Sequence, residues 1–107
     1  MRSGASTRSS AAVPRRLVEL TTSFANDWQA VFKNAQARRA VQRLIRRLQN
    51  ADTLPLEGDP LSFVPSADAP PIARFGNSRR VPRHNLWLWY RERRGRLQLL
   101  ALSRKPP

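Results

Sequence analysis

Several residue types are scarce in this sequence of 107 residues, and each scarcity excludes a class of site. There is no cysteine, so disulfide bonds and thiolate metal sites are excluded. His84 is the single histidine, which excludes a histidine-rich metal site within one chain. No apolar run approaches the roughly 20 residues of a membrane-spanning helix, and no Walker loop, HExxH motif or zinc-ligand spacing is present. We therefore expect a cytoplasmic protein with no membrane contact, no metal and no cofactor.

Acidic residues are also few. Asp and Glu number 7 against 20 Lys and Arg, so the net charge is +13, and the only lysines are Lys33 and Lys105. Arginine keeps its charge and binds phosphate with two parallel hydrogen bonds. Such an excess of charge repels itself in a compact chain, which favours a polyanion or an acidic protein as a partner. The alternative is an arginine-rich proteome in which the charge only aids solubility.

The length is sufficient for one domain. Residues 1–14 predict a disordered basic leader that ends at Pro14, and residues 15–107 predict a single domain. The leader contains Arg, Ser and Ala but no acid, as transit peptides do. An upstream start codon is the other interpretation of this segment.

Two helices are predicted in the first half, after a short strand at 17–22. The first helix is expected to be capped by Ser23 or Asn26 and to end near Lys33. The second has an apolar stripe with a period of 3.6 residues: Ala37, Val41, Leu44, Ile45 and Leu48. The rest of its surface carries five arginines, as a phosphate-binding or simply solvated face: Arg38, Arg39, Arg43, Arg46 and Arg47.

The second half predicts strands. Prolines and a glycine make residues 50–71 a long loop. Short strands are expected at 72–75 and 79–81 with a turn at 76–78, followed by a hairpin of 86–92 and 96–102. The fold class is therefore α+β, with two N-terminal helices packed on a small, mainly antiparallel twisted β-sheet.

This layout resembles the RelE/ParE superfamily of bacterial type II toxins. Residues 86–92, Leu-Trp-Leu-Trp-Tyr-Arg-Glu, and 97–105, Leu-Gln-Leu-Leu-Ala-Leu-Ser-Arg-Lys, are similar to that family's paired strands, and 18–28 resembles its first strand and helix. The resemblance implies either a ribosome-dependent mRNA endoribonuclease, as in RelE, or a DNA gyrase poison, as in ParE. It also implies a cognate antitoxin, acidic or amphipathic, that holds the toxin inactive.

The resemblance also implies positions for the catalytic cations. Arg104 and Lys105 match the place where the family keeps one. Nuclease members carry an Arg where this chain has Trp87, so Arg83 and Arg91 are the nearest substitutes in sequence. A non-catalytic basic protein that binds RNA or the ribosome is a third hypothesis, since it needs only the charge and the aromatics.

RNA cleavage through the 2′-hydroxyl needs a base, an acid and a cation that stabilises the phosphorane. Histidine changes its protonation near neutral pH, so His84 is the first candidate for acid or base, with Glu57 and Glu92 as alternatives. The predicted nucleic-acid contacts are arginines of the sheet and of the second helix, with an aromatic group that is expected to stack on bases or to fill the core: Arg79, Arg80, Arg83, Arg43, Arg46, Arg47, Trp87, Trp89 and Tyr90.

Overall fold

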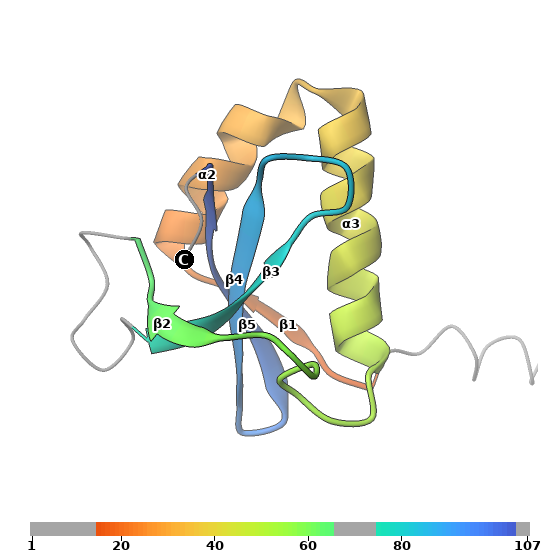
Figure 1. Cartoon of the computed structure of the whole chain (residues 1–107), viewed down its shortest axis with the longest axis vertical. Coiled ribbons are helices and arrows are strands. Elements are labelled where there is room, and N and C mark those ends of the chain that lie inside the picture. The colour runs from red at the N-terminus through yellow and green to blue at the C-terminus, as the bar shows by residue number, and fades with distance from the viewer. Residues whose placement is uncertain (1–14, 66–74, 105–107) are drawn as a thin grey trace, which may run out of the picture.

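The computed structural model describes residues 15–65 and 75–104, and within them two helices pack against a five-stranded mixed sheet (Figure 1). The elements in chain order are β1 (Val18–Leu20), α2 (Thr22–Phe32), α3 (Ala35–Asn50), β2 (Leu61–Phe63), β3 (Phe75–Arg80), β4 (Trp87–Arg93) and β5 (Arg96–Ser103). The strand order is β1-β5-β4-β3-β2. The β1–β5 pair is parallel, and the other three pairs are antiparallel. The predicted α+β class is confirmed.

The first helix begins earlier than Ser23 or Asn26 predicts, because Thr21 is its N-cap. The Thr21 hydroxyl oxygen accepts a hydrogen bond from the Phe24 N–H at 3.2 Å, and the hydroxyl donates to the Leu99 carbonyl at 2.9 Å. One side chain therefore caps α2 and ties it to β5, which shortens the preceding strand to Val18–Leu20. Thr21 was missed because Ser, Thr and Asn at neighbouring positions are all acceptable caps.

The predicted break between the helices is confirmed at Asn34, whose side-chain oxygen accepts from the Ala37 N–H at 3.1 Å and caps α3. Figure 1 shows α3 descending beside the sheet from the bend that joins it to α2. The apolar stripe of α3 packs onto the sheet with residues of α2, β4 and β5. This main core includes Phe24, Val31, Ala37, Val41, Leu44, Leu48, Leu88, Tyr90, Leu97 and Leu99.

The sheet buries apolar side chains on its other face too. Trp89, Leu100 and Ala101 form a second cluster there with Val64. The register shifts at Trp89 and Tyr90, which pair with Ala101 and Leu99, so Leu100 is an extra residue in β5. This bulge lets Leu100 and Ala101 lie in the same cluster although they are adjacent.

The prediction of a loop over residues 50–71 missed one strand, because the prolines of this segment argued against regular structure. Strand β2 lies within it and pairs with β3 at the sheet edge. The predicted turn at 76–78 is wrong, because β3 runs unbroken from Phe75 to Arg80. Gly76 marks close packing instead of a turn: a Cβ atom there would lie 2.5 Å from Leu100 Cδ1 and 3.2 Å from the Tyr90 carbonyl oxygen. The expected strand at 72–75 falls mostly outside the described residues.

The hairpin of β4 and β5 is confirmed. Its turn is Arg94–Gly95, and both residues have positive φ, 53° and 75°. Two consecutive positive φ angles are typical of the type I′ turn that matches the twist of paired strands. The glycine in the turn is therefore required by conformation.

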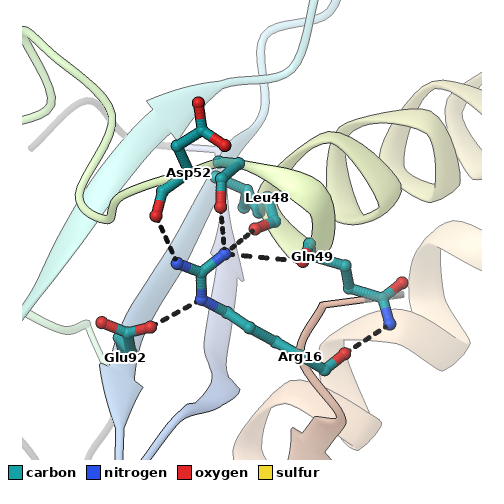
Figure 2. Close-up of polar contacts among 6 residues, drawn as sticks. Arg16, Leu48, Gln49, Asp52 and Glu92 are labelled. Atoms are coloured by element: carbon teal, nitrogen blue, oxygen red, sulfur yellow. Dashed lines mark hydrogen bonds and ion pairs between the residues drawn. The ribbon is translucent and has the colours of Figure 1, made fainter. Parts of the chain in front are cut away.

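Arg16, immediately before β1, fixes the C-terminal end of α3 (Figure 2). Its Nη1 donates to the carbonyls of Leu48, at 3.3 Å, and Ala51, and its Nε forms an ion pair with Glu92 of β4 at 2.6 Å. The last carbonyls of a helix have no partner within it, and α3 has no C-terminal glycine to redirect its chain. A buried guanidinium satisfies them from a segment 32 residues earlier in the sequence.

We expect Arg16→Met to lower the free energy of unfolding by about 2–3 kcal/mol, because helix carbonyls and Glu92 lose a charged donor. The control is Arg15→Met, which removes an exposed ion pair with Asp52 and should cost less than about 1 kcal/mol. Urea denaturation measures both. Equal losses for the two variants would contradict this role of Arg16.

Candidate nucleic-acid interface

A groove lies between the exposed side of α3 and the loop that joins β3 to β4. Its volume is about 610 Å³. Residues of α3 form one wall and three loop residues form the other: Gln36, Arg39, Ala40, Arg43, Leu44 and Arg47, and Pro82, Arg83 and His84. We call it the cationic groove, because four arginines and one histidine line it and no acid does.

The helical repeat places these arginines in a row. Arg39, Arg43 and Arg47 follow one another at intervals of four residues, so their side chains lie above one another on one side of α3. Each interval advances about 6 Å along the helix axis, since the rise is about 1.5 Å per residue. The row runs beside the buried stripe that attaches α3 to the sheet, so the position of the core sets the direction of the arginines.

The opposite wall is a loop held in a fixed shape. Val81 and Leu86, both buried, close it through a hydrogen bond from the Val81 N–H to the Leu86 carbonyl at 2.8 Å. Arg80 braces it from β3, with Nε donating to the His84 carbonyl at 2.9 Å. Arg83 has a φ of 67°, a left-handed conformation that is unfavourable for a residue with a Cβ atom. These contacts place Arg83 and His84 at the groove.

Four acids of the described residues form ion pairs away from the groove. Their ion pairs are Arg15–Asp52, Arg16–Glu92, Arg79–Asp59 and Arg96–Glu19. Within 15–65 and 75–104, none of these pairs includes a groove arginine. The groove thus keeps a concentration of positive charge that the fold does not neutralise, which favours an anionic ligand.

The structure brings together Arg43, Arg47, Arg83 and His84 among the predicted site residues. It adds Arg39, which the sequence placed on the charged face of the helix but not among the predicted nucleic-acid contacts, although it precedes Arg43 by one helical repeat. Arg46 lies apart, lining a separate shallow pocket with Gln42 and Ile45.

Two predicted arginines of the sheet have structural partners. Arg79 pairs with Asp59. The Asp59 carboxylate also accepts a short hydrogen bond from the Tyr90 hydroxyl. Burial, and then the neighbouring Asp59 carboxylate, raise the pKa of Tyr90 above its ordinary value. Arg80 braces the loop as described. Both arginines therefore hold loops against β3 through contacts within the protein.

The aromatic group divides between core and surface. Trp89 and Tyr90 are 2% and 0% exposed, so the expected stacking of bases on these two rings is wrong and their alternative place in the core is confirmed. The Trp89 indole N–H donates to Ser103 Oγ at 2.9 Å. Trp87 is half-buried and keeps part of its ring accessible. A surface role was overpredicted because periodicity alone does not reveal that both faces of this sheet are covered.

The remaining predicted catalytic residues lie in different places. Arg91 is on the hairpin side of β4, where its Nε donates to Gln98 at 2.6 Å, and burial and the charge of Arg93 lower its pKa. Because Arg91 is seven residues from His84 along an extended strand and loop, it lies away from the groove. Arg104 is exposed. It follows Ser103, the partner of Trp87, and so lies at the end of the sheet where the β3–β4 loop leads into β4. Lys105 lies outside the described residues.

The two alternative bases are separated from the groove. Glu92 pairs with Arg16, and Glu57 lies in the segment before β2. Asp27 of α2 has another function, since its carboxylate accepts the Leu102 N–H at 3.0 Å and so holds the end of β5 near Arg104. Burial raises the pKa of Asp27, and the hydrogen bond from Leu102 opposes this change.

Within the described parts of the chain, no group of three or more His, Asp or Glu side chains is placed to hold a metal ion. No helix in these parts is long and apolar enough to span a membrane. No protein-family model, curated protein or solved structure matches the chain significantly.

We expect Arg43→Ala to raise the free energy of unfolding by about 0.5–1 kcal/mol. Each like-charge pair that it removes, with Arg39 and with Arg47, costs a few tenths of a kcal/mol, and alanine is the better helix former. The contrast is Arg38→Ala, which should destabilise, because the Arg38 guanidinium lies 4.7 Å from the Phe32 ring centre and donates to the Phe32 carbonyl. Thermal unfolding followed by circular dichroism compares them. A loss of stability in Arg43→Ala would assign this residue to the fold.

Proposed function

We propose that this protein binds the phosphate backbone of RNA in the cationic groove and acts as an mRNA-cleaving toxin of a type II toxin–antitoxin system. The observation that carries the binding proposal is the row of Arg39, Arg43 and Arg47 facing Arg83 and His84, with no acid in the lining. The cleaving activity and the toxin assignment rest in addition on the resemblance of the sequence to the RelE/ParE superfamily.

An extended polyanion fits the groove better than a small anion does. The three helix arginines span eight residues, which is about 12 Å along the axis. A single phosphate contacts one or two of them, whereas successive phosphates of one strand contact all three. Arginines in a row along a nucleic-acid backbone supply affinity without reading sequence.

The presence of His84 favours RNA over DNA. An imidazole beside arginines supplies a proton acceptor next to groups that stabilise a dianionic phosphorane, and the 2′-hydroxyl that would lose the proton exists only in RNA. In this proposal His84 takes the proton of the 2′-hydroxyl, whose oxygen forms a bond to phosphorus. The bond from phosphorus to the 5′-oxygen then breaks, that oxygen receives a proton from the imidazolium or from water, and Arg83 and Arg43 stabilise the charge of the transition state. An acidic antitoxin segment that covers the groove would prevent RNA from binding.

We expect Arg43→Ala/Arg47→Ala to weaken binding of a single-stranded RNA oligonucleotide about tenfold, since two exposed ionic contacts contribute up to about 1 kcal/mol each. The slope of log K against log salt should decrease by about 1.4, because each lost phosphate contact on a single strand contributes about 0.7. Fluorescence anisotropy over a salt series measures both quantities.

The matched control is Arg46→Ala/Arg94→Ala, which removes the same charge from positions outside the groove. It should retain most of the affinity. Equal losses in the two double variants would mean that net charge alone binds the RNA, and the groove would lose its assignment.

We expect His84→Ala to abolish most RNA cleavage, by about 10²–10⁴-fold, while the protein stays folded and still binds RNA. Only the His84 backbone, and not its imidazole, contributes hydrogen bonds to the loop. Arg104→Ala should likewise cost much more activity than stability, because Arg104 is an exposed strand end. Induced expression in bacteria, with pulse labelling of protein and DNA synthesis and mapping of mRNA ends, provides the measurement.

Rapid loss of protein synthesis with new ends in coding regions, both removed by His84→Ala, is the expected result. Intact mRNA with falling DNA synthesis would instead indicate a gyrase poison. Full toxicity of His84→Ala with unchanged mRNA ends would remove this residue from the chemistry. An absence of any growth effect would leave a basic RNA- or ribosome-binding protein.

A further inference from the structure

A second pocket, of about 340 Å³, lies where the segment before β2 meets β3 and the start of β4. We call it the Trp87 pocket. Its lining comes from the segment before β2 and from strands β3 and β4: Glu57, Gly58, Asp59 and Pro60, and Ser78, Arg79, Arg80 and Trp87. A hydrogen bond from the Ser78 N–H to the Pro60 carbonyl, at 3.2 Å, holds the two sides together.

The charges of this pocket balance, unlike those of the cationic groove. Arg79 is paired with Asp59 at 2.9 Å, and the Asp59 side chain is 5% exposed. Glu57 and Arg80 add one charge of each sign to the lining. A phosphate gains little in such a mixed lining, whereas a neutral ring with hydrogen-bonding edges meets both donors and acceptors.

Arg80 and Trp87 offer flat surfaces for a ring. The Arg80 guanidinium lies 5.8 Å from the centre of the Trp87 ring. Two edges of this guanidinium are fixed, since Nε donates to the His84 carbonyl and Nη2 donates to Asn85 Oδ1 at 3.0 Å. One face of the guanidinium lies over the Trp87 ring, so a base would stack on the opposite face or on the accessible part of the indole, since bases stack on indole rings and on guanidinium planes.

The pocket also contains a polar atom without a partner. Ser78 is 2% exposed, and its Oγ forms no hydrogen bond. Buried hydroxyls in folded proteins are normally satisfied, and Ser78 belongs to the pocket wall, so a water or a ligand atom that reaches this hydroxyl would supply the missing partner.

We infer that the Trp87 pocket binds one nucleobase of the RNA strand whose phosphates occupy the cationic groove. This inference rests on the proposed function. Arg80 connects the two sites, because it lines the Trp87 pocket and donates to the carbonyl of His84, which lines the groove. A base held against Arg80 therefore fixes the position of the strand relative to His84 and determines which phosphodiester lies beside the imidazole.

Nucleosides and ribose 5-phosphate separate the two sites in one NMR experiment. The chain has three tryptophans and one histidine, so the indole N–H signal of Trp87, assigned with Trp87→Phe, reports the pocket and the imidazole signal of His84 reports the groove. Nucleosides lack phosphate and should shift the Trp87 signal. Ribose 5-phosphate lacks a base and should shift the His84 signal but leave Trp87 unchanged.

No Trp87 shift with millimolar nucleosides, while His84 still responds to ribose 5-phosphate, would overturn the base pocket and leave the proposed function standing. No His84 response to ribose 5-phosphate, combined with unchanged RNA affinity in Arg43→Ala/Arg47→Ala, would overturn the proposed function.

Two variants test the inference on RNA itself. Trp87→Leu should weaken binding of an RNA oligonucleotide about tenfold and leave an abasic oligonucleotide of equal length unaffected. Phe63→Leu is the control and should leave binding of both oligonucleotides unchanged. Phe63 is an aromatic residue of β2 that is 63% exposed and whose ring packs on Phe75, outside the Trp87 pocket. Ser78→Ala should keep or raise stability while reducing the nucleoside-induced shift. Equal losses for base-containing and abasic RNA in Trp87→Leu would overturn the inference.

Discussion

The cationic groove depends on the hydrogen bonds that the Arg16 guanidinium makes at the end of α3. A helix that ends without a glycine exposes carbonyl dipoles, and here those dipoles converge on a buried cation. The same cation is paired with Glu92 of β4, so the helix end is held against the sheet that carries the other wall of the groove. Without this contact the last turn, which includes Arg47, would have no polar link to β4 among those described here.

Two groups of arginines in this chain are distinguished only by the structure. Arg15, Arg16, Arg79 and Arg96 are paired with acids and connect distant segments of the fold. Those of the groove have no acidic partner in the described residues and repel one another along α3. Positive charge is therefore neutralised where these pairs support the fold and is left without acidic partners on one side of α3. Such an arrangement gives up some stability locally and retains a strong field for a polyanion.

Much of this fold follows from patterns that are local in the sequence. The stripe of α3 and the hairpin around Gly95 each depend on neighbours within a few residues, so periodicity and turn chemistry predict them. The failures involve contacts across the chain. Gly76 suggests a turn in the sequence, but in the structure it allows Leu100 to pack closely against the strand. Nothing near Arg16 in the sequence indicates that it caps a helix that ends 34 residues later.

The candidate site was predicted in the same partial way. The groove arginines were recognised as a charged helix face, because their spacing is visible in the sequence. Which loop would face them was not visible, since the β3–β4 connection reaches α3 only through the tertiary packing. For Trp89 and Tyr90 base stacking and a place in the core were both left open, because alternation along a strand distinguishes its two faces but does not show that both are covered.

The parallel pairing of β1 with β5 joins the two ends of the described chain. Residues 18–20 align with residues 97–99, and Arg16 and Glu92 are separated by 76 positions. During synthesis, β4, which carries Glu92, and β5, the partner of β1, emerge from the ribosome after both helices, so the core closes only once residues 96–103 have been translated. The arginines of α3 are made long before the loop that completes their groove. A nascent chain therefore exposes a basic helix beside ribosomal RNA well before it has a formed binding site.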